Sequence, residues 1–283
     1  MRIGISAFAW TGQFKERHLS LLPEIKEIGL SAVEIPMFDP SALPLEGIRS
    51  VCRDIGLECT VCAILPVGVN PISQDANVRQ RAIAHLKRCI EATATMGAKL
   101  LGGPLYSPLG YFPGHRVSQQ EWKWAVQAFQ SLTEELDRYE LQLSIEPVNR
   151  SETFFLRTAE ETKGLCDEIG SPRIGATVDT FHANIEEQDI PSAIQSLGGR
   201  LKHLHASEND RGVLGKGHVP FAQIIAALTQ VNYAGYLMVE GFGYSADETE
   251  GPGWLWAAPE ISPRTLAVES ATYLRELLVR CDG

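Results

Sequence analysis

Four residues that could hold a cation or move a proton recur at regular intervals in the second half of the chain. Glu146, Asp179, His205 and Glu240 are separated by 33, 26 and 35 residues. Three carboxylates and an imidazole suit a hard or borderline divalent ion such as manganese, magnesium or cobalt, and suit zinc less well. Two of the carboxylates could also act as acid and base toward a bound substrate. The residue types therefore predict a metal-dependent enzyme, provided that the fold brings them together.

The elements around these residues suggest how they could meet. Short apolar, β-branched runs occur at residues 2–8, 32–37, 59–65, 100–106, 142–148, 174–180, 201–207 and 236–242. Segments with helical spacing lie between them, among them 21–28, 78–96, 119–139, 158–169 and 221–228. Eight apolar strands that alternate with helices predict an α/β fold, a closed (β/α)8 TIM barrel. In this fold catalytic groups collect at the carboxyl ends of the strands, which is where the four residues lie.

Composition sets the broad class of the protein. The chain has 283 residues, of which 44% are hydrophobic and 21% charged, and no Pro/Ser-rich linker divides it. We therefore expect a single TIM-barrel domain over residues 1–283. A net charge of −10 disfavours nucleic acid and anionic membranes as partners. Because no stretch approaches the ~20 apolar residues of a membrane span, and no export signal is evident, we expect a soluble cytoplasmic protein.

The six cysteines fit reduced thiols better than a disulfide framework. Cys59 and Cys62 form a C-x-x-C motif, but they lie within a predicted strand. Residues three apart on a strand point to opposite faces, so these two thiols should not share a metal ion or a disulfide.

Motifs with fixed spacing surround the four residues. They are Glu146-x-x-Asn149-Arg150-x-Glu152, Asp179-Thr-Phe-His182, His203-x-His205 with Glu208-x-x-Arg211, and Glu240. Together they resemble the ketose 3-epimerases, the D-tagatose and D-allulose (psicose) 3-epimerase family of xylose isomerase-like TIM barrels. The similarity covers nearly the whole chain and is densest between residues 142 and 242.

The resemblance implies an isomerase that epimerises a free ketose, a small-molecule sugar, at carbon-3 through an enediolate. It also implies one bound divalent ion, commonly manganese, and a homodimer or homotetramer. The implied residues are Glu146, Asp179, His205 and Glu240 as metal ligands, Glu146 and Glu240 as the acid and base, and Glu152, His182 and Arg211 as substrate-binding or orienting groups.

Other interpretations stay open at this point. His203 could be the ligand in place of His205, and Arg211 could pair with Glu208 or Asp210 at the surface. The same site could serve an aldose–ketose or hydroxypyruvate-type isomerase, or a sugar or inosose dehydratase. An endonuclease IV-like enzyme is disfavoured, because such barrels need more ligands, for several zinc ions, and a basic face, whereas this chain has a net charge of −10. A sugar-binding module without catalysis would need no pair of carboxylates at a metal.

Two long connections and the first strand bear on substrate size. Residues 107–116 and 243–261 are too long for simple turns and could form lids or subunit contacts at the mouth of the barrel. Phe8, Trp10 and Phe14 are expected to form part of the pocket wall. Because these regions differ from the characterised epimerases, the sugar itself stays open and could be an oxidised glycoside or an inositol derivative.

Overall fold

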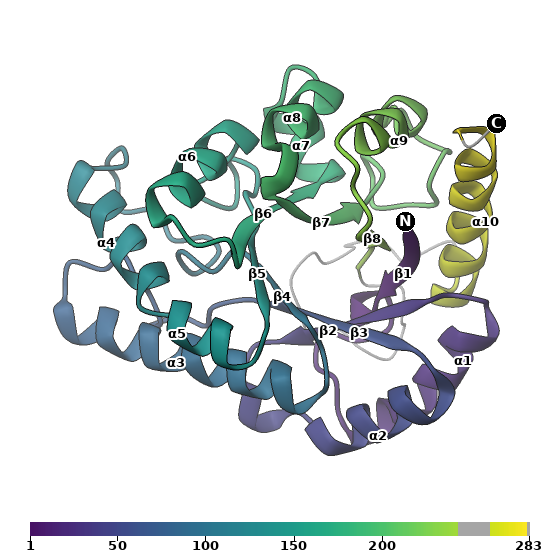
Figure 1. Ribbon diagram of the computed structural model, residues 1–283, viewed down its shortest axis with the longest axis horizontal. Coiled ribbons are helices and arrows are strands. Elements are labelled where there is room, and N and C mark those ends of the chain that lie inside the picture. Colours follow the sequence, from purple (N-terminus) through teal and green to yellow (C-terminus); the bar gives the residue numbers. More distant parts are fainter. Residues whose placement is uncertain (243–260, 282–283) are drawn as a thin grey trace.

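The computed structural model describes residues 1–242 and 261–281, so most of the predicted 243–261 connection lies outside the described residues. Eight strands close into a barrel in chain order, each parallel to its neighbours (Figure 1). They are β1 (Arg2–Ser6), β2 (Ala32–Met37), β3 (Glu58–Ala63), β4 (Leu100–Gly103), β5 (Gln142–Ile145), β6 (Ile174–Asp179), β7 (Leu201–Ala206) and β8 (Tyr236–Val239). The predicted TIM barrel is confirmed.

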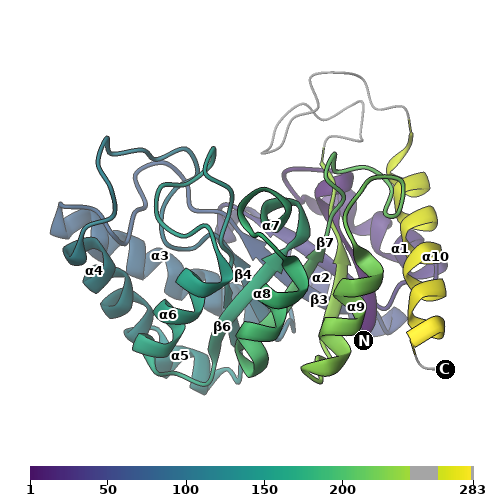
Figure 2. The same cartoon turned by 90° about the horizontal axis from the view of Figure 1, so that it is seen from above.

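Helices surround the barrel (Figure 1). They are α1 (Leu21–Glu27), α2 (Leu45–Ile55), α3 (Ala76–Thr95), α4 (Gln119–Gln130), α5 (Thr133–Arg138), α6 (Ala159–Ile169), α7 (Thr180–Glu186), α8 (Ile190–Leu197), α9 (Phe221–Gln230) and α10 (Pro263–Cys281). α10 runs alongside α9 (Figure 2) and packs on β1 and β8, so it covers the seam where the first and last strands pair. Within the described part of the chain, no helix is both long and apolar enough to cross a bilayer.

The predicted helix over residues 119–139 is divided into α4 and α5. Ser131 lies between them and donates its Oγ–H to the carbonyl of Ala128 at 2.6 Å. A serine hydroxyl that bonds to a nearby backbone carbonyl competes with helical pairing, which explains the break.

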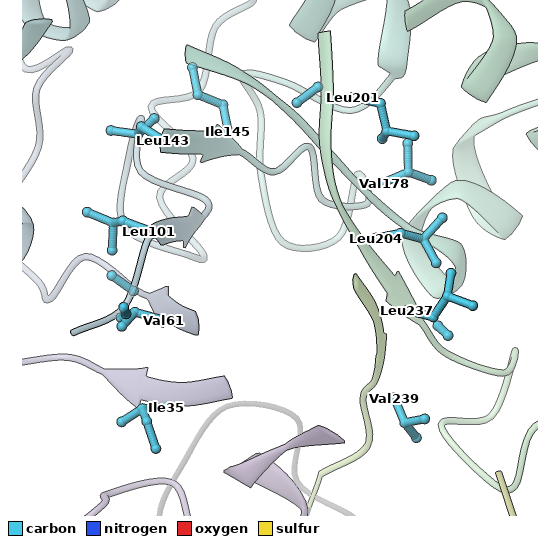
Figure 3. Close-up of a cluster of buried hydrophobic side chains, with 14 of the residues drawn as sticks. Ile35, Val61, Leu101, Leu143, Ile145, Val178, Leu201, Leu204, Leu237 and Val239 are labelled. Carbon is cyan, nitrogen blue, oxygen red and sulfur yellow. The ribbon is translucent and has the colours of Figure 1, made fainter. Parts of the chain in front are cut away.

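Alternate residues of each strand face opposite sides of the barrel wall. The labelled apolar side chains in Figure 3, such as Ile35, Val61 and Leu204, point away from the barrel centre. The intervening positions face the interior. Glu34 of β2 and His203 of β7 lie 2.8 Å apart although their strands are not neighbours, so the two side chains must meet inside the barrel. The outward-facing apolar side chains thus pack beneath the helices, whereas polar side chains such as Glu34 and His203 occupy the barrel interior.

Five strands end two or three residues earlier than the apolar runs predict. The backbone leaves the barrel there to enter the loops at the mouth. Glu146 nevertheless donates its N–H to Gly103 at 3.0 Å, and Glu240 donates to Ala206 at 3.1 Å. These two bonds continue the strand pairing by one residue, so both glutamates are fixed by the sheet rather than by a mobile loop.

Candidate active site

The four predicted ligands come together at the carboxyl ends of β5 to β8. One possible ligand atom from each of Glu146, Asp179, His205 and Glu240 lies within 4.8 Å of the others, and all four residues are buried. The ring nitrogen Nδ1 of His205 is 2.9 Å from Glu146 Oε1 and 3.5 Å from Glu240 Oε2. The set can therefore converge on a single ion.

The charge of this cluster fits a divalent cation. The Arg211 guanidinium lies among the carboxylates, with Nη1 2.8 Å from Asp179 Oδ2 and 2.7 Å from Glu240 Oε2. Burial raises the pKa of Glu240 to about 8. Burial alone would lower the pKa of His205, but the Glu240, Glu34 and Glu146 carboxylates raise it well above its usual value. Extra protons thus neutralise an excess of negative charge, and a cation can take their place.

We expect the apparent affinity for Mn²⁺ to rise with pH. Ligands bind a metal in their deprotonated form, so the ion must displace the protons that Glu240 and His205 hold at neutral pH. As the pH rises from about 6 to about 8, fewer protons have to leave and binding strengthens. Titration calorimetry in two buffers of different ionisation enthalpy measures the number of protons released. An affinity that does not change over this range would contradict the expectation.

The three predicted substrate-binding residues lie beside the ligands. Glu152 accepts a hydrogen bond from Asn149 Nδ2 at 2.7 Å. Asn149 also donates its backbone N–H to Nδ1 of His182 at 3.2 Å. Burial lowers the pKa of His182, which favours its neutral form. The geometry therefore links Glu152, Asn149 and His182 in one hydrogen-bonded group.

Arg211 points inward rather than toward Glu208 or Asp210. Its guanidinium carbon lies 4.1 Å from the centre of the Phe181 ring, and Nη1 also donates to Ser207 Oγ at 2.7 Å. The carboxylate of Glu208 is used differently, since it accepts N–H bonds from the loop that follows β7. The surface ion pair considered from the sequence is therefore wrong.

A cavity of about 300 Å³ opens onto this cluster. Its polar lining comes from Glu146, Glu152, His182, Asp210, Arg211 and Glu240, and its apolar lining from Phe8, Cys62, Ile64, Pro104, Leu109, Val148, Phe181 and Phe242. Of the predicted wall residues, Phe8 lines the cavity. Trp10 and Phe14 are not among the described lining residues: Phe14 is buried in the hydrophobic core, and the partly buried Trp10 packs against that core.

Sequence reasoning missed two residues of the interior. Glu34 of β2 is fully buried and lies 2.8 Å from His203 Nε2 and 2.9 Å from His205 Nε2. His203 thus faces Glu34, and it belongs to neither group of possible metal ligands among the described residues. His205, rather than His203, therefore lies at the cluster. Cys62 lines the cavity, and with Glu34, His205 and Glu240 it forms a second group of ligand atoms within 4.8 Å.

The C-x-x-C motif behaves as its position on a strand predicts. Cys62 lines the cavity, whereas Cys59 lies near Cys52 of α2, and the neighbouring Cys52 thiol raises the pKa of the Cys59 thiol. The two thiols lie on opposite faces of β3 and do not form a common site.

Comparison with known proteins agrees with this geometry. The family described as xylose isomerase-like TIM barrel matches residues 22–277. A probable ketose 3-epimerase of Synechocystis sp. is 28% identical over 276 residues, which cover 98% of this chain and 96% of that protein. An L-ribulose 3-epimerase of Mesorhizobium japonicum is 31% identical over 242 residues, covering 85% and 81%. The structure of a D-allulose 3-epimerase from Methylomonas sp. in complex with D-allulose has a TM-score of 0.90 at 25% identity, covering 98% and 96%.

Proposed function

Because the chain belongs to the xylose isomerase-like TIM barrel family, in which its relatives are carbohydrate isomerase-type enzymes, we propose that it epimerises a free ketose at carbon-3 through an enediolate. One observation carries the proposal. Glu146 and Glu240 approach the same imidazole nitrogen from β5 and β8, two strands that are not neighbours, and both line the cavity. Two carboxylates that reach one cavity from different sides can serve the two faces of a planar intermediate.

The proposed chemistry inverts carbon-3 by proton transfer on its two faces. One glutamate removes the carbon-3 proton from one face, and the other glutamate delivers a proton to the opposite face. The roles exchange when the reaction runs in reverse.

The other cavity residues would hold the sugar. Arg211 offers fixed guanidinium donors, and His182 and Glu152 offer an imidazole and a carboxylate to sugar hydroxyls. A divalent ion held by Glu146, Asp179, His205 and Glu240, manganese in our proposal, would polarise the substrate oxygens on carbon-2 and carbon-3 and so acidify the carbon-3 hydrogen.

Proton NMR in heavy water tests this function. The manganese-treated protein is incubated with a panel of ketopentoses and ketohexoses, the metal is removed, and the sugars are examined. We expect the hydrogen on carbon-3 to exchange with solvent and the carbon-3 epimer to appear. Exchange at carbon-1 with formation of an aldose would instead support the isomerase, and loss of water would support the dehydratase.

Several expectations stay predictions. They are manganese as the ion, a homodimer or homotetramer, a single domain over residues 1–283 and a cytoplasmic location. The role of residues 107–116 as a lid or subunit contact also stays a prediction. In the structure this loop is fastened to the next one by a 2.8 Å bond from Gly110 N–H to the Glu152 carbonyl, and its Leu109 lines the cavity.

A further inference from the structure

A buried carboxylate lies behind the candidate metal ligands, on the side away from the cavity. Glu34 follows the inward-facing alternation of β2, and its carboxylate is fully buried. Its Oε2 accepts a hydrogen bond from Thr60 Oγ1 at 3.1 Å and lies 2.8 Å from His203 Nε2. Two groups on β3 and β7 therefore fix one of its oxygens, and Oε1 is left to face His205.

Glu34 and the candidate site contact opposite edges of the same ring. His205 Nε2 lies 2.9 Å from Glu34 Oε1, whereas Nδ1 lies 2.9 Å from Glu146 Oε1. Neither Glu34 Oε1 nor His205 Nε2 makes a directed hydrogen bond within the described residues. The 2.9 Å approach between these two atoms is therefore the polar contact through which Glu34 acts on His205. A neutral imidazole has one N–H and one lone pair, on different nitrogens. For Nδ1 to offer its lone pair to a cation, the proton must lie on Nε2, beside Glu34.

The contact between Glu34 and His205 lies in the buried interior of the barrel. All the side-chain atoms involved are shielded from water, and a buried carboxylate without a partner is costly. The two buried histidines supply partners, since His203 Nε2 lies 2.8 Å from Glu34 Oε2 and His205 Nε2 lies 2.9 Å from Glu34 Oε1. Each oxygen of the carboxylate thus faces an imidazole nitrogen.

We propose that Glu34 is a positioning residue, which holds the proton of His205 on Nε2, fixes the ring orientation and so presents Nδ1 as a metal ligand. The inference rests on the proposed function, since it needs a cation at Glu146, Asp179, His205 and Glu240. A carboxylate behind a metal-binding histidine also raises the basicity of the ligand, and loss of such a partner typically costs about 10–100-fold in metal affinity.

The test compares Mn²⁺ affinity of the full-length protein and its variants by titration calorimetry. Glu34→Gln keeps the shape of the side chain but removes its charge, and we expect it to bind Mn²⁺ about 10–100-fold more weakly. Glu58→Gln is the matched control, because it makes the same change on β3 at an exposed residue that pairs with Arg2. We expect this control to keep wild-type affinity. Glu34→Asp, which keeps the charge, should recover part of the lost affinity.

A second readout reports the ring itself. Long-range proton–nitrogen NMR of protein labelled with ¹⁵N-histidine, loaded with diamagnetic Mg²⁺, distinguishes a proton on Nε2 from one on Nδ1, and a His205→Asn variant identifies the signal. We expect the Nε2–H form in the wild type and a mixture of forms in Glu34→Gln. Circular dichroism identifies a variant that fails to fold. In that case the wild-type protein alone tests the proposal, and an Nδ1–H form of His205 in the wild type would overturn it.

The outcomes separate this inference from the proposed function. If the wild type exchanges the carbon-3 hydrogen and Glu34→Gln binds Mn²⁺ as tightly as the wild type, the positioning role falls and the function stands. If the wild type binds Mn²⁺ but no ketose reacts, the function falls, while weakened binding in Glu34→Gln still supports the positioning role. A Co²⁺-loaded sample tests the second ligand group. An absorption band from thiolate coordination that is lost in Cys62→Ser would place the ion on Glu34 and Cys62 instead, and would also overturn the proposal.

Discussion

Glu146→Gln and Glu240→Gln are each expected to lower kcat for ketose epimerisation by about 10²–10⁴-fold. Each change removes one of the two groups that would exchange a proton with carbon-3, whereas the amide keeps the size of the side chain. Both residues are fixed to the sheet by backbone bonds to Gly103 and Ala206, so the exchange should leave the barrel intact. The rate is measured by the appearance of the epimer, and Glu58→Gln should keep wild-type turnover.

The hydrogen-exchange pattern of these two variants tests the mechanism more sharply than their rates. If each glutamate serves one face, a variant that lacks one of them still removes the carbon-3 hydrogen from one epimer and returns deuterium to the same face. We therefore expect each variant to label one epimer without converting it, and the two variants to label opposite epimers. Wild-type turnover in either variant, or labelling of the same epimer by both, would contradict two-base catalysis.

The barrel and its four candidate ligands could be predicted because both depend on regular spacing. Apolar strands at intervals of about one strand–helix unit leave few folds to choose from, and a parallel barrel brings every strand end to one face. Glu146, Asp179, His205 and Glu240 all lie at such ends, and the structure brings them together. Their positions follow from strand order alone, without knowledge of how side chains pack.

Glu34 was missed because it lies in the middle of a strand and its partner is on the far side of the barrel. A usable signal was present: it is an acidic residue within the apolar run 32–37, at an inward-facing position. Nothing in the sequence, however, shows that β2 and β7 side chains meet across the interior. That contact depends on the width of the closed barrel.

The contacts made by loop residues could not be predicted from the sequence either. The resemblance implies that Glu152 binds substrate or orients a catalytic group, but it does not show that Asn149 Nδ2 donates a hydrogen bond to the Glu152 carboxylate. Arg211 adopts a left-handed backbone conformation with φ of 61°, which is uncommon for a residue other than glycine. Such turns depend on local packing, and residue spacing does not encode them.

Removal of the metal is expected to abolish activity while leaving the protein folded. Without the ion, Arg211 still neutralises part of the charge on Asp179 and Glu240 through its 2.8 and 2.7 Å contacts, so the carboxylates do not force the barrel apart. A chelator-treated sample should thus show wild-type circular dichroism and no epimerisation, and Mn²⁺ should restore the rate. Full activity in a sample shown by elemental analysis to hold no metal would contradict this expectation.

Thermal unfolding then distinguishes a bound ion from a loosely associated one. An ion that binds only the folded chain stabilises it by about 2.7 kcal/mol at 100 times its Kd, which corresponds to a rise in Tm of roughly 4–5 °C for a protein of this size. Asp179→Asn is the informative variant, because Asp179 Oδ1 also accepts the Phe181 N–H that starts α7, at 2.8 Å. Asparagine can keep that helix cap through its amide oxygen, but it places an NH2 group where the charged Oδ2 faces the site and accepts from Arg211. We expect Asp179→Asn to unfold at or below the temperature of the metal-free wild type and to show little rise with Mn²⁺. An unchanged rise in this variant would mean that the ion binds elsewhere.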